Sequence, residues 1–234
     1  MRLGVFGGTF NPIHHGHLRA AEEVRELMNL DRVIFMPSGT PPLKHEDVIG
    51  PSHRYAMTEL ATEGNDAFAV SDLELQRPEK SFTVSTLETF REQHPDGDIF
   101  FIVGLDAFLD LPNWWMPERL TGLADFIVVT RPGFRLGDLH RSPYIDETSA
   151  PADECVPEGA AGPVQGGLPG QAGAGLLRDL RFRSGKKIHP VAVTPLDISS
   201  TAIRALLQEG KSVRYLLPDR VIRYISVHAL YVRR

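Results

Sequence analysis

The sequence has few of the features that mark secreted or membrane proteins. Its 234 residues include a single cysteine, Cys155, which excludes an internal disulfide and gives no sign of an oxidising compartment. No apolar run approaches the roughly 20 residues of a membrane helix. The stretch from Met1 to Phe6 has neither the length nor the cleavage site of a signal peptide. We therefore expect a soluble, cytoplasmic protein that does not contact a membrane.

The chain also has fewer basic than acidic residues, with 25 Lys and Arg against 30 Asp and Glu. The net charge is −5, so the chain has no overall basic surface of the kind that attracts nucleic acid. An anionic ligand would have to meet a local cluster of positive groups. The length of 234 residues is enough for one α/β domain with a full core, and the hydrophobic content of 42% is ordinary for a soluble globular protein. The composition leaves a homo-oligomer open.

Short apolar runs alternate with amphipathic stretches through most of the chain. This pattern predicts one domain over 1–234, an α/β fold with a Rossmann-like, doubly wound parallel sheet and helices on both faces, because parallel neighbours need a crossover helix. Candidate caps are Ser81 or Thr83, and Ser199 or Ser200; Pro218 is expected at the first helical position, and Gly210 just past a helix end. The expected strands lie at 3–6, 32–36, 68–70, 99–103, 126–129 and 188–193, and the helices at 17–28, 52–62, 84–90, 200–208 and 218–228.

One segment breaks this rhythm. Residues 135–187 are expected to form an irregular insertion before the last strand, because 151–175 is rich in Gly, Ala and Pro and poor in large apolar residues. We expect the insertion to contribute little core of its own.

The junction between the first strand and first helix is rich in ligand-binding signals. Gly7 and Gly8 allow close approach of the backbone, and Thr9 and Phe10 follow them. His14 and His17 are three residues apart at the helix start, where free N–H groups and the helix dipole favour an anion. The whole segment reads Gly7-Gly8-Thr9-Phe10-Asn11-Pro12-Ile13-His14-His15-Gly16-His17. A plain glycine turn with two surface histidines is the alternative, but the combination argues against it. The segment is neither a Walker loop nor a GxGxxG fingerprint.

The string GGTFNPIHHGHL resembles the HxGH signature of nucleotidyltransferases, close to the GGTFDPxHxGHL form of nicotinate-nucleotide adenylyltransferases. The resemblance implies that His14 and His17 contact the phosphates of ATP. The sequence departs from the pattern at Asn11, which replaces a usual Asp and keeps hydrogen bonding without charge.

A second string, 198–204, resembles the ISSTxIR motif of the same family. Taken alone, it would be an ordinary capped helix with a surface arginine. The resemblance implies ATP phosphate binding by residues of this string, namely Ile198, Ser199, Ser200, Thr201 and Arg204.

Four intermediate segments carry the resemblance further. They are similar to the family's PPHK, SYTxDTL, GxD…LPxW and RPG stretches, and here read PPLK, SFTVSTL, GLD…LPNWW and RPG. The resemblance implies that an aromatic residue, Trp114 or its neighbour Trp115, stacks on a nicotinate ring, and that amides near Thr83 accept its carboxylate. The implied nicotinate mononucleotide site comprises Lys44, Thr83, Val84, Gly104, Asp106, Trp114 and Arg131.

The implied reaction is attack of a mononucleotide 5′-phosphate on the α-phosphate of ATP, with His14, His17, Lys44 and Arg204 as the catalytic cations. Mg²⁺ would be bound through the ATP phosphates, since the acidic residues show no metal-ligand spacing. Three alternatives stay open: a sister enzyme acting on nicotinamide mononucleotide or phosphopantetheine, a non-catalytic nucleotide sensor, and an NAD(P)-dependent oxidoreductase. The paired Thr83 and Trp114 segments argue against phosphopantetheine, and the missing fingerprint argues against the oxidoreductase.

Overall fold

The computed structural model describes residues 1–40, 48–77, 80–130, 136–146, 148 and 175–232. Within these residues, eight strands form one sheet in the order β3-β2-β1-β4-β5-β8-β6, with β7 also paired to β8. The parallel strands are β1 (Arg2–Gly8), β2 (Arg32–Pro37), β3 (Phe68–Val70), β4 (Asp98–Gly104), β5 (Asp125–Thr130) and β8 (Lys187–Ala192). The predicted α/β class and the position of every predicted strand are confirmed to within two residues.

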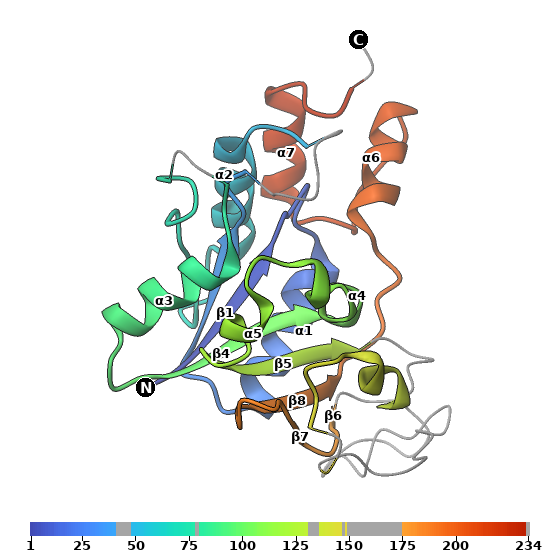
Figure 1. Ribbon diagram of the computed structural model, residues 1–234. Coiled ribbons are helices and arrows are strands. Elements are labelled where there is room, and N and C mark those ends of the chain that lie inside the picture. Colours follow the sequence, from blue (N-terminus) through green and yellow to red (C-terminus); the bar gives the residue numbers. More distant parts are fainter. Residues whose placement is uncertain (41–47, 78–79, 131–135, 147, 149–174, 233–234) are drawn as a thin grey trace.

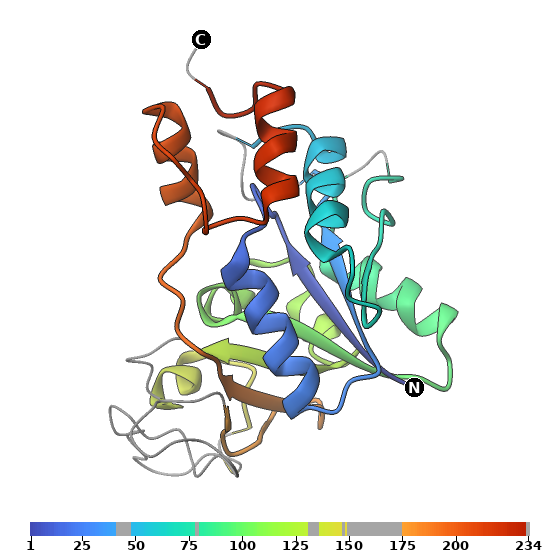
Figure 2. The ribbon, with the colours of Figure 1, turned by 180° about the vertical axis from the view of Figure 1, so that it is seen from behind.

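Helices cover both faces of this sheet, as the sequence pattern predicted (Figures 1 and 2). Side chains of β4 alternate between two cores: Phe101 and Val103 pack on one face, and Phe100 and Ile102 on the other. The first core is closed by α3 (Thr83–Gln93), α4 (Leu105–Leu109) and α5 (Pro117–Leu120). The second is closed by α1 (His15–Leu27), α2 (Pro51–Thr62), α6 (Ser200–Gln208) and α7 (Asp219–Val227). None of the helices in the described residues is long and apolar enough to cross a membrane.

Several helix boundaries differ from prediction, as the starts of α3, α7 and α1 show. Phe82, rather than Ser81 or Thr83, occupies the N-cap of α3, because the Ser81 hydroxyl accepts a distant backbone N–H from Gly39. Pro218 is the N-cap of α7, one position earlier than expected, and α1 begins two residues before the expected His17. Caps depend on tertiary partners as well as on local sequence, so helix boundaries shift by one or two residues from the sequence pattern.

The expectation that 135–187 adds little core is wrong for its described parts. Leu139, Ile145, Leu180 and Phe182 are each at most 3% exposed and belong to the first core. The ring of Phe182 lies edge-on to Phe126 of β5 at 4.9 Å. The short strands β6 (Gly175–Leu176) and β7 (Leu180–Arg181) run antiparallel to β8, and η2 (Leu136–Arg141) is a short 3₁₀ segment. The Gly- and Pro-rich part, 149–174, lies outside the described residues.

Candidate functional site

Two cavities meet above the carboxyl ends of β1 and β4, where the strand order reverses direction. Such a switch point is the usual ligand site of an open parallel sheet. The larger, of about 1290 Å³, is the histidine cavity; it contains both histidines of the first motif and the start of α6. The smaller, of about 720 Å³, is the aromatic cavity; it contains Phe82 and both tryptophans. The residues lining both cavities are Gly7, Gly8, Thr9, Gly104, Asp106 and Ala107.

The two histidines lie together at the start of α1. Their rings stack with centroids 3.7 Å apart, and His14 is 4% exposed. The backbone N–H of His14 donates to Nδ1 of His17 at 3.3 Å. Because Nδ1 accepts this bond, the neutral ring of His17 carries its proton on Nε2, where it can be donated to a ligand. The helix N-terminus adds partial positive charge at the same place.

The turn after β1 is shaped by close contacts. A side chain at Gly8 would lie 2.8 Å from the Phe10 ring, and one at Gly7 would lie 3.0 Å from Phe101. Phe10 itself is 3% exposed and packs edge-on to His17 at 5.2 Å. The glycines therefore leave room for the aromatic packing that fixes the turn, and Phe10 lines the cavity mainly as a wall.

The structure brings the second motif to the first. Ser199 caps α6 by accepting the N–H of Ala202, and it does not line the histidine cavity. Ser200 donates its hydroxyl to the carbonyl of Pro12 at 2.9 Å. Of the other motif residues, Ile198, Thr201 and Arg204 line the histidine cavity. Gly210 ends α6 at φ +67° with the paired backbone bonds of a Schellman motif, as predicted.

Asn11 connects the first motif to the end of the chain. It is 5% exposed, and its carbonyl accepts Nη1 of Arg204 at 2.9 Å. Its side-chain oxygen accepts the hydroxyl of Tyr231 at 2.8 Å and the N–H of Ile49 at 3.4 Å. The side-chain amide that replaces the usual Asp thus accepts hydrogen bonds from two segments, and the backbone carbonyl of Asn11 accepts one from a third.

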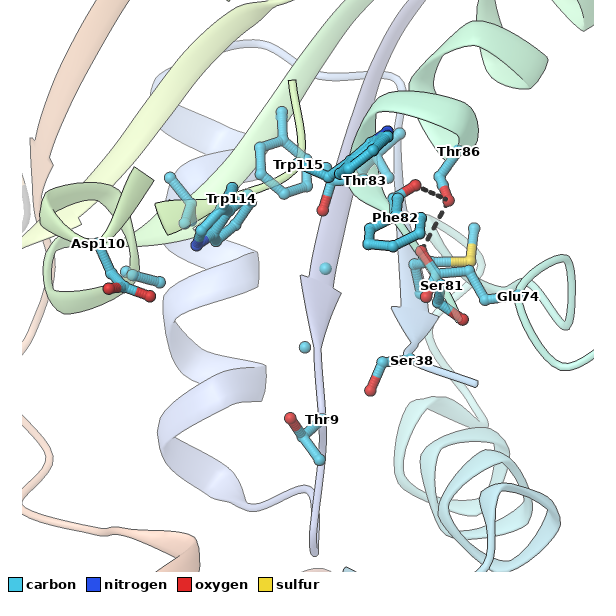
Figure 3. Close-up of a pocket in the computed structure, with 18 of the residues that line it drawn as sticks. Thr9, Ser38, Glu74, Ser81, Phe82, Thr83, Thr86, Asp110, Trp114 and Trp115 are labelled. Carbon is cyan, nitrogen blue, oxygen red and sulfur yellow. Dashed lines mark hydrogen bonds between the residues drawn. The ribbon is translucent and has the colours of Figure 1, made fainter. Parts of the chain in front are cut away.

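Aromatic residues form one end of the aromatic cavity, and Thr9 and Ser38 lie toward the other (Figure 3). Trp114 is partly buried against the first core and lies edge-on to Phe101 at 6.2 Å. Trp115 is 58% exposed, with its ring 5.4 Å from that of Phe82. Both tryptophans line the cavity, so both are placed to stack on a flat ring.

The predicted acceptor residues divide into three groups. Thr83, the first residue of α3, lines the aromatic cavity together with Gly104 and Asp106. Val84 is 3% exposed, contributes to the first core and lines neither cavity. Lys44 and Arg131 lie outside the described residues.

Three buried charged residues at the site carry no sequence signal that would have selected them. Glu74 is 7% exposed, lines the aromatic cavity, and has its pKa raised by burial. Glu23 of α1 is 2% exposed and accepts both the N–H and the hydroxyl of Thr194, at 2.7 and 2.5 Å. Arg54 of α2 is fully buried, and burial lowers its pKa. The sequence contains many other glutamates and arginines, and only the fold shows that these three are buried and which groups they contact.

The chain is similar to known proteins in sequence and in fold. A model of the cytidylyltransferase-like family matches residues 5–206. The probable nicotinate-nucleotide adenylyltransferase of Geobacter sulfurreducens is 40% identical over 232 residues, which cover 99% of this chain and 98% of that protein. The protein of the same name from Geobacter metallireducens is 42% identical with the same coverage. A solved structure of Plasmodium falciparum nicotinic acid mononucleotide adenylyltransferase complexed with NaAD has a TM-score of 0.70 at 19% identity, covering 98% of this chain and 97% of that one.

Proposed function

We propose, from the premise that this chain belongs to the cytidylyltransferase-like family, that it is a nicotinate-nucleotide adenylyltransferase. It transfers the adenylyl group of ATP to nicotinate mononucleotide, giving nicotinate adenine dinucleotide and pyrophosphate in NAD biosynthesis. The observation that carries this proposal is the meeting of two different cavities over one glycine turn. The histidine cavity suits a triphosphate, and the aromatic cavity suits a flat ring.

The triphosphate of ATP lies in the histidine cavity in this proposal. Nε2–H of His17 and the start of α1 address the α- and β-phosphates, and His14 stands beside them. Thr201, Arg204 and the start of α6 address the phosphates that leave as pyrophosphate. These groups neutralise charge that develops as the bond to the leaving group breaks.

The acceptor lies in the aromatic cavity with its ring against Trp114 or Trp115. Its carboxylate meets the first turn of α3, at Thr83 and Val84, where backbone N–H groups and the helix dipole favour an anion. Its 5′-phosphate is directed toward the shared turn at Gly7 and Gly8. Lys44 and Arg131 belong to this site by family resemblance alone.

No general base is needed for this reaction. The second pKa of a phosphate monoester is about 6, so the nucleophile is already largely dianionic at pH 7. The task of the protein is to hold two anions in line. Mg²⁺ enters with ATP as part of the substrate complex, held by phosphates and water with few protein ligands.

The function is tested by incubating the protein with ATP and one acceptor at a time, and measuring pyrophosphate and dinucleotide. We expect kcat/KM for nicotinate mononucleotide to exceed that for nicotinamide mononucleotide at least about 10²-fold, because the amide NH₂ would face N–H donors and leave them unpaired at about 1–3 kcal/mol each. Similar values for both acceptors would point to the sister activity. Binding of ATP without turnover of any acceptor would point to a nucleotide sensor. Association into a homo-oligomer stays a prediction that a sedimentation experiment can test.

A further inference from the structure

The site contains a buried cation that the proposed reaction does not use directly. Arg54 lies on the first turn of α2 and is 0% exposed. Its Nε–H donates to the carbonyl of Ile49 at 3.1 Å, and its Nη1 to the carbonyl of Thr9 at 2.8 Å. Its Nη2 donates to the carbonyl of Gly39 at 2.8 Å. The rigid guanidinium fork therefore joins three separate backbone segments at once.

Two of these segments form the floor of the site. Thr9 belongs to the glycine turn after β1 and lines both cavities. Gly39 directly follows β2, next to Ser38, which lines the aromatic cavity. Because Arg54 holds the Thr9 carbonyl from beneath, the orientation of the turn that faces the phosphates depends on this side chain.

The opposite side of Gly39 is bound to the acceptor end of the site. Its N–H donates to Oγ of Ser81 at 3.1 Å. The Gly39 N–H and the Ser81 hydroxyl also hydrogen-bond to the carboxylate of Glu74. Glu74 in turn accepts the hydroxyl of Thr86, in α3, at 2.7 Å (Figure 3). A side chain at position 39 would overlap the Glu74 carbonyl oxygen and lie 2.7 Å from the Ser81 hydroxyl, so only glycine fits between them.

These bonds form one continuous buried connection, which we name the Arg54 bridge: Thr9, Arg54, Gly39, Ser81, Glu74 and Thr86. One end is the turn that receives the ATP phosphates in the proposed function, and the other is the start of α3, which receives the nicotinate carboxylate. We propose that Arg54 is a positioning residue that fixes these two ends relative to each other and thereby aligns the acceptor phosphate with the α-phosphate of ATP.

This inference rests on the proposed function and makes a separate kinetic prediction. Each substrate binds mainly to its own end of the site, so a loosened bridge leaves each binding step largely intact. The alignment of the two is lost, and misplacement by about 1 Å can slow a reaction about 10²-fold. A bridge that served only the stability of the fold would not separate kcat from KM in this way.

The test uses two variants that weaken the bridge at different points. Arg54→Lys keeps the positive charge, but its compact ammonium cannot reach three diverging carbonyls. Gly39→Ala removes no side chain and changes a residue that lines neither cavity; the added methyl group weakens the bridge by displacing Ser81 and the backbone of Glu74. We expect each to lower kcat at least about tenfold, while KM for each substrate, and the calorimetric affinity for each substrate alone, change less than about threefold.

The matched control is Gly50→Ala, at the N-cap of the same helix α2, where an added side chain would have its nearest contact at 4.0 Å, to His53. It should retain the wild-type kcat. Thermal unfolding of all variants shows whether they are folded at the assay temperature.

Several results would overturn the inference. Folded Arg54→Lys and Gly39→Ala variants with kcat within about twofold of the wild type would do so. So would a loss of substrate affinity that accounts for the whole loss of activity. If Arg54→Lys does not fold, Gly39→Ala decides alone, and failure of both to fold would assign the bridge to stability. An inactive wild-type protein would instead refute the proposed function, so the two failures are distinguishable.

Discussion

Replacing His17 with alanine is expected to lower kcat about 10²–10³-fold, equivalent to about 2.7–4 kcal/mol of transition-state stabilisation. The magnitude follows from the geometry of the ring. Nδ1 accepts the backbone N–H of His14, so the remaining proton on Nε2 is directed by the fold rather than by the ligand. A donor oriented in advance needs no reorganisation when charge develops on the phosphates, and its loss is felt mainly in the transition state.

The same substitution should leave the protein folded. His17 makes ring contacts with Phe6 at 6.2 Å, with Phe10 at 5.2 Å and with His14 at 3.7 Å. Aromatic pairs contribute about 0.5–1.5 kcal/mol each, so the free energy of unfolding should fall by about 1.5–4.5 kcal/mol. For a chain of this size each kcal/mol lowers Tm by about 2–4 °C, which leaves the variant folded at 25 °C.

The assay is pyrophosphate release at saturating ATP and nicotinate mononucleotide, with thermal unfolding measured in parallel. His15→Ala is the matched control: the side chain is one helical position from His14 but lines a different groove, beside Leu18 and Arg19. It should retain kcat to within about twofold. Near-normal turnover by His17→Ala, or an equal loss in His15→Ala, would refute the role given to His17.

Three further predictions concern buried groups that the sequence did not single out. Phe182→Ala should lower the free energy of unfolding by about 3–5 kcal/mol in urea titrations, because the ring is 1% exposed, and a loss below about 1 kcal/mol would contradict its place in the core. Glu23→Ala should raise KM for ATP more than KM for the acceptor, since the carboxylate holds Thr194 in the wall of the histidine cavity; an unchanged KM for ATP would remove that role. Burial raises the pKa of Glu74 above 4.5, so with rising pH the unfolded chain loses this proton before the folded protein does. The carboxyl group therefore contributes fully to stability below pH 4.5, and its contribution declines as pH rises through the folded-state pKa. Glu74→Gln should flatten this part of the pH–stability curve relative to the wild type, and parallel curves for the two proteins would contradict this role of Glu74.

The sequence predicted those parts of the fold that local pattern controls. Strands such as β1 and β4 are short apolar runs buried on both faces, and the 3.6-residue stripe of α1 is equally plain. The cap at Ser199 and the end at Gly210 also follow from local chemistry. The insertion was misjudged because Leu180 and Phe182 are few in number, and only tertiary packing shows that they reach the first core.

The meeting of the two motifs at one cavity, with His14 and Arg204 in its lining, was predictable because both strings resemble known ones. It was not predictable where function depends on long-range contacts. Arg54 binds carbonyls at positions 9 and 39, and its own residue type gives no sign of this. The sequence could not separate Trp114 from Trp115 either, and the structure places both in the cavity.

The contacts of Asn11 with Arg204 and Tyr231 have a consequence for biosynthesis of the chain. All six parallel strands lie within residues 2–192. The proposed triphosphate site also needs α6, whose Arg204 donates to the carbonyl of Asn11 in the turn after β1, so this site is completed only after residues 200–208 have been synthesised. A chain truncated after residue 192 would retain every parallel strand and lack the α6 part of the proposed nucleotide site.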